Sequence, residues 1–319
     1  MGEHRVIGGN NDTLFVKVFV TGVNGQLGYD AACRLRSRGH SVIGSGSSPQ
    51  ESHASVAGVY KYIRLDIRDE KAVKETLECI HPDAIIHCAA WTDVDAAENQ
   101  KNRPIVKAIN ADGTRFIAEA AHLVNAKMMY ISTDYVFDGK GDKPWKPDDK
   151  NFAPLNYYGQ TKLEGELAVS GLIDNFFIVR TAWVFGRGKN FIKTMINVGK
   201  THETVRVVND QIGTPTYSVD LARLLVDMVE TEKYGYYHAT NSEISLNGFV
   251  SWYDYCREFY RQFGLSTSVI PVSTEEYGQS RAARPKNSRL DKSKLVLSGF
   301  IPLPDWKDAI SRYLQEDEI

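Results

Sequence analysis

A tyrosine and a lysine four residues apart, Tyr158 and Lys162, lie in the stretch LNYYGQTKLEGELAV. Residues with this spacing share one face of a helix, so the ammonium group of Lys162 would lie beside the phenol of Tyr158. A neighbouring cation lowers the pKa of a phenol, and the lysine could also bind ribose hydroxyls of a cofactor. The pair could therefore deliver a proton to a substrate. An exposed Tyr/Lys pair without a catalytic role is the more frequent interpretation of this spacing alone.

Polar residues upstream make the catalytic interpretation stronger. In YISTDYVFDG, at the end of an expected strand, Thr133 or Ser132 could donate a hydrogen bond to a carbonyl oxygen, as ketone reduction requires. Tyr157 has no lysine four residues later, and we interpret it as a packing residue. Asn110, in KAINADG, has two interpretations: support of a proton relay through water, or a hydrogen bond within a helix.

Three glycines, Gly22, Gly25 and Gly28, directly follow an expected strand in VFVTGVNGQLG. The first can turn sharply, the second lets the backbone approach a pyrophosphate, and the third allows close packing of helix on strand. Glycine spacing alone fits an ordinary turn equally well. Its position on the first strand of a βαβ pattern favours a dinucleotide-binding loop.

The end of the second expected strand bears on the choice of cofactor. A carboxylate there would favour NAD by accepting a hydrogen bond from the ribose 2′-hydroxyl. The sequence GSGSS, residues 44–48, holds no acid and has no arginine nearby. Small hydroxyl residues can accept a 2′-phosphate, so we expect NADPH to be preferred and NADH tolerated. The alternative for this stretch is a plain flexible turn.

The elements that must position these residues alternate between short β-branched runs and helical stretches. This pattern predicts an α/β fold, a Rossmann-type doubly wound parallel sheet covered on both faces. Expected strands are residues 16–22, 41–46, 62–66, 84–90, 127–134 and 176–181; expected helices are 27–38, 70–79, 105–124 and 158–170. Such sheets bind ligands at the carboxyl ends of their strands.

The alternation breaks after residue 182, which predicts a division of the chain. We expect an N-terminal extension over residues 1–15, an NAD(P)-binding domain over 16–182, and a smaller α/β substrate-binding region over 183–319. Residues 219–240 are expected to return to the main sheet. No Pro/Ser-rich linker separates the two parts, so they should pack closely.

Composition excludes several classes of protein. The 319 residues are 42% hydrophobic, enough for a sizeable core, and the net charge of −2 with no Lys/Arg run argues against nucleic acid as a partner. No apolar stretch approaches the roughly 20 residues that span a bilayer, and no secretory signal is present, which predicts a cytoplasmic protein. The four cysteines lack CxxC spacing and are expected to be reduced thiols without metal.

The chain resembles the dTDP-4-dehydrorhamnose reductase family of extended short-chain dehydrogenases/reductases. The resemblance runs from about residue 16 to the C-terminal region through VTGVNGQLG, HCAAWTDVDAAE, ISTDYVFDG, PLNYYGQTKLEGE, RTAWVFG, NDQIGTPT and RPKNSRL. It implies NAD(P)H-dependent reduction of the C4 ketone of dTDP-4-dehydro-L-rhamnose to dTDP-L-rhamnose, a step of rhamnose and cell-wall polysaccharide synthesis. In this role Thr133 would hold the carbonyl, Tyr158 would supply the proton, and Lys162 would tune Tyr158 and hold the ribose.

The resemblance and the strand-end positions together give two expected binding sets. The cofactor set is Gly22, Asn24, Gly25, Gln26, Leu27, Gly28, Ser45, Asp66, Ile67, Cys88, Ala89, Ala90, Thr92, Tyr158 and Lys162. The set for the dTDP-sugar is Thr92, Asp134, Val136, Trp183, Asn190, Gln211, Thr214, Pro215 and Arg284. The guanidinium of Arg284 suits a diphosphate through its fork geometry. Trp183 is either a flat wall of the site or a half-buried core residue.

Three questions stay open at this point. Some members of the family need a divalent cation at subunit contacts, so Mg²⁺ and a homodimer are both open, although the sequence shows no tight carboxylate or histidine cluster. The substrate could be another nucleotide sugar, with reduction or epimerisation as the reaction. The chain could also be a non-catalytic regulatory subunit, like the relative that binds methionine adenosyltransferase. The intact set of Thr133, Tyr158 and Lys162 argues against that last alternative.

Overall fold

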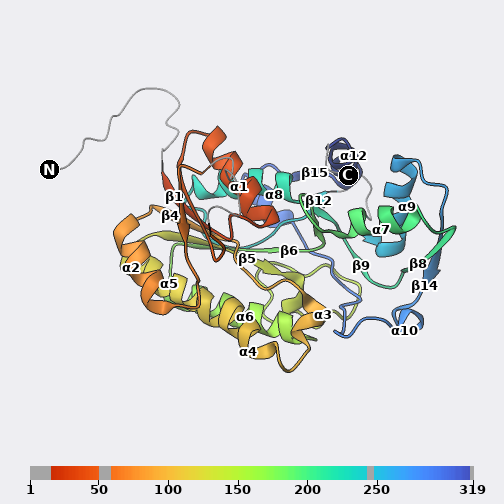
Figure 1. Ribbon diagram of the computed structural model, residues 1–319, viewed down its shortest axis with the longest axis horizontal. Coiled ribbons are helices and arrows are strands. Elements are labelled where there is room, and N and C mark those ends of the chain that lie inside the picture. Colours follow the sequence, from red (N-terminus) through yellow and green to blue (C-terminus); the bar gives the residue numbers. More distant parts are fainter. Residues whose placement is uncertain (1–15, 50–58, 243–247, 317–319) are drawn as a thin grey trace.

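The computed structural model describes residues 16–49, 59–242 and 248–316, so the expected extension over 1–15 lies outside it. Within this part of the chain, the main element is a seven-stranded sheet in which all neighbouring strands are parallel (Figure 1). In spatial order the strands are β11 (Gly235–His238), β6 (Phe176–Thr181), β5 (Lys127–Thr133), β4 (Ala84–His87), β1 (Lys17–Thr21), β2 (Ser41–Gly46) and β3 (Lys61–Arg64). The order reverses between β1 and β4, as in doubly wound sheets. The predicted fold class is confirmed.

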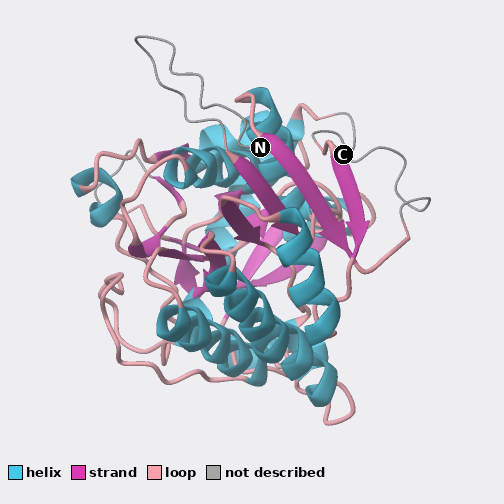
Figure 2. Cartoon of the chain, turned by 90° about the vertical axis from the view of Figure 1, so that its left-hand side faces the viewer, coloured by secondary structure: helices cyan, strands magenta, loops and turns pink. Residues whose placement is uncertain are grey.

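Helices cover both faces of this sheet (Figures 1 and 2). One face carries α1 (Gln26–Ser37) and α8 (Ser218–Val229), which pack on each other. The other face carries α2 (Glu70–Ile80), α5 (Thr114–Leu123) and α6 (Tyr157–Leu172), with α4 (Arg103–Lys107) and the π-helical turn η2 (Ala108–Gly113) leading into α5. Because both faces are covered, inner strands such as β4 are buried at every position.

The start of α6 fixes the face that its side chains present. Asn156 caps this helix, since its side-chain oxygen accepts a hydrogen bond of 2.8 Å from the backbone of Gly159. The other end of the amide donates to the carbonyl of Ala283, 2.9 Å away. With the helix beginning at Tyr157, Tyr158, Lys162 and Glu166 lie on one face at successive turns.

A buried ion pair joins that face of α6 to the sheet. The guanidinium of Arg180 on β6 donates to both carboxylate oxygens of Glu166, at 2.9 and 2.7 Å, and both side chains are buried. Arg180 also donates to the carbonyl of Pro147 at 3.0 Å. The pair thus positions the helix that carries Tyr158 and Lys162.

Removing one partner of this pair is expected to be costly. Arg180→Met leaves the carboxylate of Glu166 buried without its cation, so we expect the free energy of unfolding to fall by about 3–5 kcal/mol in urea denaturation. The matched control is the double variant Arg180→Met with Glu166→Leu, which removes both charges of the pair and should recover most of the loss. A single variant within about 1 kcal/mol of the parent would contradict this role.

The rest of the chain forms the second region, seen on the right of Figure 1. The short helix α3 (Val94–Ala97) and the 3-10 turn η3 (Asp134–Val136) follow β4 and β5 of the main sheet. The helices of the second region itself are α7 (Phe191–Gly199), α9 (Trp252–Phe263), α10 (Thr274–Tyr277), α11 (Ser293–Leu297) and α12 (Trp306–Leu314). Its strands are β7 (Val184–Phe185), β8 (Thr204–Val208), β9 (Ile212–Gly213), β10 (Thr216–Tyr217), β12 (Asn241–Ser242), β13 (Val250–Ser251), β14 (Ser268–Val272) and β15 (Leu303–Asp305). Helices α7, α9 and α12 enclose an aromatic-rich core of their own.

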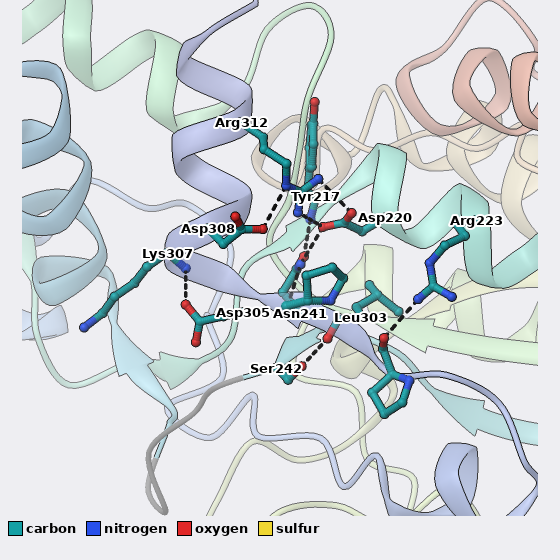
Figure 3. A network of polar contacts seen from close by, with 12 residues as sticks. Tyr217, Asp220, Arg223, Asn241, Ser242, Leu303, Asp305, Lys307, Asp308 and Arg312 are labelled. Atoms are coloured by element: carbon teal, nitrogen blue, oxygen red, sulfur yellow. Dashed lines mark hydrogen bonds and ion pairs between the residues drawn. The ribbon is translucent and has the colours of Figure 1, made fainter.

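A polar network ties the C-terminal helix to the sheet domain (Figure 3). Arg312 on α12 donates to both oxygens of Asp220 on α8, at 2.9 and 2.7 Å. Asn241 donates to the same carboxylate at 2.7 Å and accepts from the backbone of Tyr217. Because these residues come from α8, α12, β10 and β12, hydrogen bonds between side chains and backbone join the two parts of the chain.

Candidate active site

Two hollows lie at the carboxyl ends of the central strands. The first encloses about 500 Å³ between β1, β5, α6 and the second region, and the other about 420 Å³ between β1, β2 and the segment after β3. They share Gly22, Gly25, Cys88 and Ala90 as lining residues, so they adjoin across the glycine loop. This is the point where the strand order reverses, the usual ligand position in such sheets.

The glycine loop can accept a pyrophosphate. Helix α1 begins at Gln26 without a side-chain cap, which leaves backbone N–H groups and the positive end of the helix dipole facing the hollows. A Cβ at Gly28 would lie 2.3 Å from the carbonyl oxygen of Gly22, so only glycine allows this close turn. Buried Ser45 Oγ and Asn24 Oδ1 have no hydrogen-bond partner among the described residues. These features fit a bound dinucleotide.

The second hollow carries the groups expected to hold the adenosine half. Ser45, Asp66 and Ile67 line it, together with Ser47 and Arg68. Our expectation that no arginine lies nearby is therefore wrong. Arg68 donates to Asp66 at 2.9 Å, which lowers the pKa of that carboxyl. A further guanidinium, that of Arg64 at the end of β3, donates to the carbonyl of Ser47 at 3.2 Å. Parallel pairing of β2 with β3 brings these residues together.

Thr133, Tyr158 and Lys162 meet in the first hollow. Thr133 ends β5, and its hydroxyl donates to Asp134 Oδ1 at 3.1 Å while accepting from the backbone of Tyr135 at 3.3 Å. The Nζ atom of Lys162 donates to the carbonyl of Ile131 at 2.7 Å and lies over the ring of Tyr130. A hydroxyl donor, a phenol and an ammonium group thus surround one space beside the glycine loop.

The pKa values of this trio differ from the simple expectation. Burial raises the pKa of Tyr158, the charge of Asp134 raises it further, and the hydroxyl of Thr133 lowers it. Burial also lowers the pKa of Lys162 to about 7. Lys162 is not among the groups that shift the pKa of Tyr158 in this structure, where its Nζ is directed to the carbonyl of Ile131, so the tuning of Tyr158 by Lys162 stays a prediction. The spacing of Tyr158 and Lys162 along the helix did not reveal that burial would shift both pKa values toward the uncharged forms.

Asn110 acts through hydrogen bonds to protein groups. It lies in η2 and is fully buried. Its amide accepts from the backbone N–H of Trp91 at 2.8 Å and donates to the carbonyl of Trp91 and to Thr161 Oγ1, both at 3.2 Å. These bonds favour the second interpretation of Asn110. They hold the segment containing Ala89, Ala90 and Thr92 against α6, beside the hollows.

Trp183 forms one wall of the first hollow with a partner that the sequence did not suggest. Its backbone has a φ of 51°, unusual for an aromatic residue, and its ring stacks on Trp252 at a centroid distance of 3.9 Å. Gly213 makes room for this ring, because a Cβ there would lie 3.0 Å from it. The wall interpretation of Trp183 is therefore favoured over the core interpretation.

Of the expected residues, most line one hollow or the other. In the described part of the chain, six do not: Val136, Asn190, Gln211, Thr214, Pro215 and Arg284. Val136 is buried in a small core with Phe137. Asn190 is a helix cap, which accepts from the backbone of Lys193 and donates to Gly186 and Tyr313. For these six residues a role in binding the dTDP-sugar stays a prediction.

The NDQIGTPT motif supports the wall rather than lining the hollow. Gln211 donates to Thr274 at 3.1 Å, Thr214 is buried, and the carbonyl of Pro215 accepts from the backbone of Asn241. Arg284 is likewise engaged, with Asp95 at 2.7 Å and the hydroxyl of Tyr135 at 3.3 Å. Its guanidinium therefore joins the second region to α3 and to Tyr135.

Several lining residues were not expected from the sequence. They include Trp252, Lys189, Val94, Tyr135 and Val184. Trp252 begins α9 after the cap Ser251, whose side chain accepts from the backbone of Asp254. That S-x-x-D pattern marks a helix start, but only the folded chain places the indole against Trp183. Lys189 is exposed in the loop before α7 and brings a cation to the rim.

Two structural findings bear on membranes and metals. No helix in the described ranges combines the length and apolar character needed to span a bilayer. Across the same ranges, His, Cys, Asp and Glu side chains do not gather in a group of three or more that could hold a metal ion. The structure gives no support for Mg²⁺.

Comparison with known proteins places this geometry among sugar-nucleotide enzymes. The model of a family described as RmlD substrate binding domain matches residues 16–319. The dTDP-4-dehydrorhamnose reductase of Escherichia coli strain K12 is 39% identical over 263 residues, which cover 79% of this chain and 85% of that protein. A solved dTDP-4-dehydrorhamnose reductase from Clostridium acetobutylicum is 39% identical with a TM-score of 0.83, covering 93% of this chain and 98% of its own. One from Bacillus anthracis, in complex with NADP, is 38% identical with a TM-score of 0.80, covering 94% and 99%.

Proposed function

Because the chain belongs to the family described as RmlD substrate binding domain, we propose that its first hollow reduces the C4 ketone of dTDP-4-dehydro-L-rhamnose to dTDP-L-rhamnose. The protein is an NAD(P)H-dependent oxidoreductase of dTDP-rhamnose synthesis. The observation that carries the proposal is the meeting of Thr133, Tyr158 and Lys162 beside a glycine loop shaped for a pyrophosphate.

The side chains of the protein supply the hydrogen bond to the carbonyl oxygen, the proton and the stabilising cation, and the cofactor supplies the hydride. When bound, the reduced nicotinamide provides that hydride for the carbonyl carbon. We propose that Thr133 donates a hydrogen bond to the carbonyl oxygen and that Tyr158 transfers its proton to the same oxygen. We propose that, with cofactor and substrate bound, the ammonium of Lys162 stabilises the phenolate left behind and so opposes the rise in the pKa of Tyr158 that burial causes. The Trp183–Trp252 pair supplies an apolar wall for the sugar.

A panel of activated sugars tests this assignment. The protein would be given dTDP-, UDP- and GDP-4-keto sugars with NADPH, and loss of the reduced cofactor would be followed by absorbance. We expect turnover with dTDP-4-dehydro-L-rhamnose well above that with any other sugar. Turnover restricted to a UDP or GDP sugar would contradict the proposal, and so would epimerisation without net loss of NADPH.

We propose that NADPH is preferred over NADH. Ser45 and Ser47 in the second hollow can donate to a 2′-phosphate. The cation of Arg68 lines the same hollow, and that of Arg64 donates to the carbonyl of Ser47 beside it. The NADP in the Bacillus anthracis relative supports this choice. The cytoplasmic location and a homodimer stay predictions.

A charge placed at Ser47 tests the preference. Ser47→Asp sets a carboxylate where the 2′-phosphate would lie, and like charges a few ångströms apart repel, so we expect the KM for NADPH to rise at least about tenfold. The KM for NADH should change little, because a carboxylate can accept from the 2′-hydroxyl. Ser47→Asn, of the same shape without the charge, is the control. Equal effects of Ser47→Asp on both cofactors would refute the proposed phosphate position.

A further inference from the structure

The hydroxyl of Thr133 faces two competing acceptors. A threonine hydroxyl has one proton to donate. In the structure that proton goes to Asp134 Oδ1 at 3.1 Å. The proposed reaction needs the same proton on the carbonyl oxygen of the substrate. An ionised carboxylate is the stronger acceptor of the two, since charge-assisted hydrogen bonds are about twice as strong as neutral ones. While Asp134 is ionised, Thr133 therefore points away from the substrate.

Asp134 is buried where its charge is poorly compensated. The residue is 2% exposed, and its Oδ2 has no hydrogen-bond partner among the described residues. Thr133 at the end of β5 and Tyr158 on α6 face it, and the segment after α10 contributes the hydroxyl of Ser288 and the cation of Arg284. That cation already pairs with Asp95 at 2.7 Å. Burial outweighs these partners and raises the pKa of Asp134 to about 7.

We propose that Asp134 carries a proton in the reactive state and acts as a positioning residue that turns the hydroxyl of Thr133 toward the substrate carbonyl. This inference rests on the proposed function. A protonated carboxyl donates to Thr133 Oγ1 instead of accepting from it, which frees the threonine proton for the carbonyl oxygen. It also removes a negative charge beside Tyr158, where a phenolate forms as the phenol gives up its proton.

The proton balance of the reaction stays unchanged. Hydride from the reduced nicotinamide forms the new C–H bond, and the proton on the alcohol oxygen comes from Tyr158. Asp134 keeps its own proton throughout. Its protonation is a condition for turnover and not a step of it.

The pH dependence of kcat/KM tests this role in the whole enzyme with NADPH and dTDP-4-dehydro-L-rhamnose. In the parent enzyme, once the pH is high enough to ionise Asp134, this ionisation alone should lower kcat/KM tenfold for each further pH unit. Asp134→Asn keeps a neutral donor to Thr133 at every pH. In a plot of log(kcat/KM) against pH, the alkaline fall of this variant should therefore be less steep than that of the parent by one unit of slope. This difference holds whichever other groups titrate. Asp134→Ala has no donor, and its kcat/KM at pH 6 should be at least tenfold below that of Asp134→Asn.

Each outcome decides the matter. An unchanged alkaline slope in Asp134→Asn overturns the proposal, and so does equal activity of the alanine and asparagine variants at pH 6.

NADPH binding, measured by fluorescence, shows that each variant is folded. An infrared band of a protonated carboxyl, present in the parent at pH 6, lost at pH 9 and absent from Asp134→Asn, supports it without any turnover. Its absence at pH 6 overturns it. No turnover of this sugar by the parent would instead count against the proposed function.

Discussion

Tyr158→Phe is expected to lower kcat by about 10²- to 10⁴-fold, the usual contribution of a positioned proton donor. The substitution removes one oxygen and keeps the ring, which packs edge-on against Tyr135 at a centroid distance of 5.8 Å. The dissociation constant of NADPH should therefore stay within about twofold of the parent value. Steady-state kinetics measures kcat, and a fluorescence titration measures the dissociation constant of NADPH separately.

The neighbouring tyrosine offers a matched control. Tyr157→Phe makes the same chemical change one residue earlier, where the ring packs against the guanidinium of Arg103 and does not line the first hollow. We expect its kcat to remain close to that of the parent. If the two variants lost activity equally, or if Tyr158→Phe turned over normally, the proton would have to come from another group.

Lys162→Met is expected to damage binding and rate together. The methionine has a similar length, but it lacks the ammonium that would donate to the ribose and stabilise the phenolate. Hydrogen bonds to charged groups contribute about 1.5–3 kcal/mol, so the dissociation constant of NADPH should rise by roughly ten- to a hundredfold. The kcat should fall at least about a hundredfold, since the buried phenolate would have no cation nearby.

Lys162→Arg separates charge from shape. It keeps the cation in a bulkier group, so kcat should exceed that of Lys162→Met while remaining below that of the parent. Isothermal titration with NADPH and steady-state kinetics check both parameters. A methionine variant with unchanged cofactor affinity would show that Lys162 does not hold the ribose.

Features that depend on short spacing were predictable from the sequence. The glycine loop after β1 and the Tyr158–Lys162 pair are each encoded within one turn or one helix, and the alternation of strands and helices gave the sheet. What burial does to pKa values was not predictable, because the spacing of Tyr158 and Lys162 is the same on an exposed helix. Asp134 shows the same limit, since its raised pKa depends on the second region folding over it.

Contacts between distant segments account for the remaining errors. Trp252 reaches Trp183 only when α9 packs beside β7, and Arg68 enters the second hollow only because β3 pairs with β2. Asn190 is an instructive exception. An asparagine directly before an apolar helix is a strong candidate for a cap, and this local rule predicts its observed role better than motif resemblance did.

In the proposed reaction, the hollow beside Tyr158 directs a hydride from the cofactor to C4 of a dTDP-linked 4-keto sugar. Deuterium at the transferable position of NADPH tests it most directly, with mass spectrometry and NMR of the product from dTDP-4-dehydro-L-rhamnose. We expect dTDP-L-rhamnose with one deuterium at C4 from the parent enzyme, and almost no such product from Tyr158→Phe. Product without deuterium, deuterium at another carbon, or no product from this sugar would contradict it.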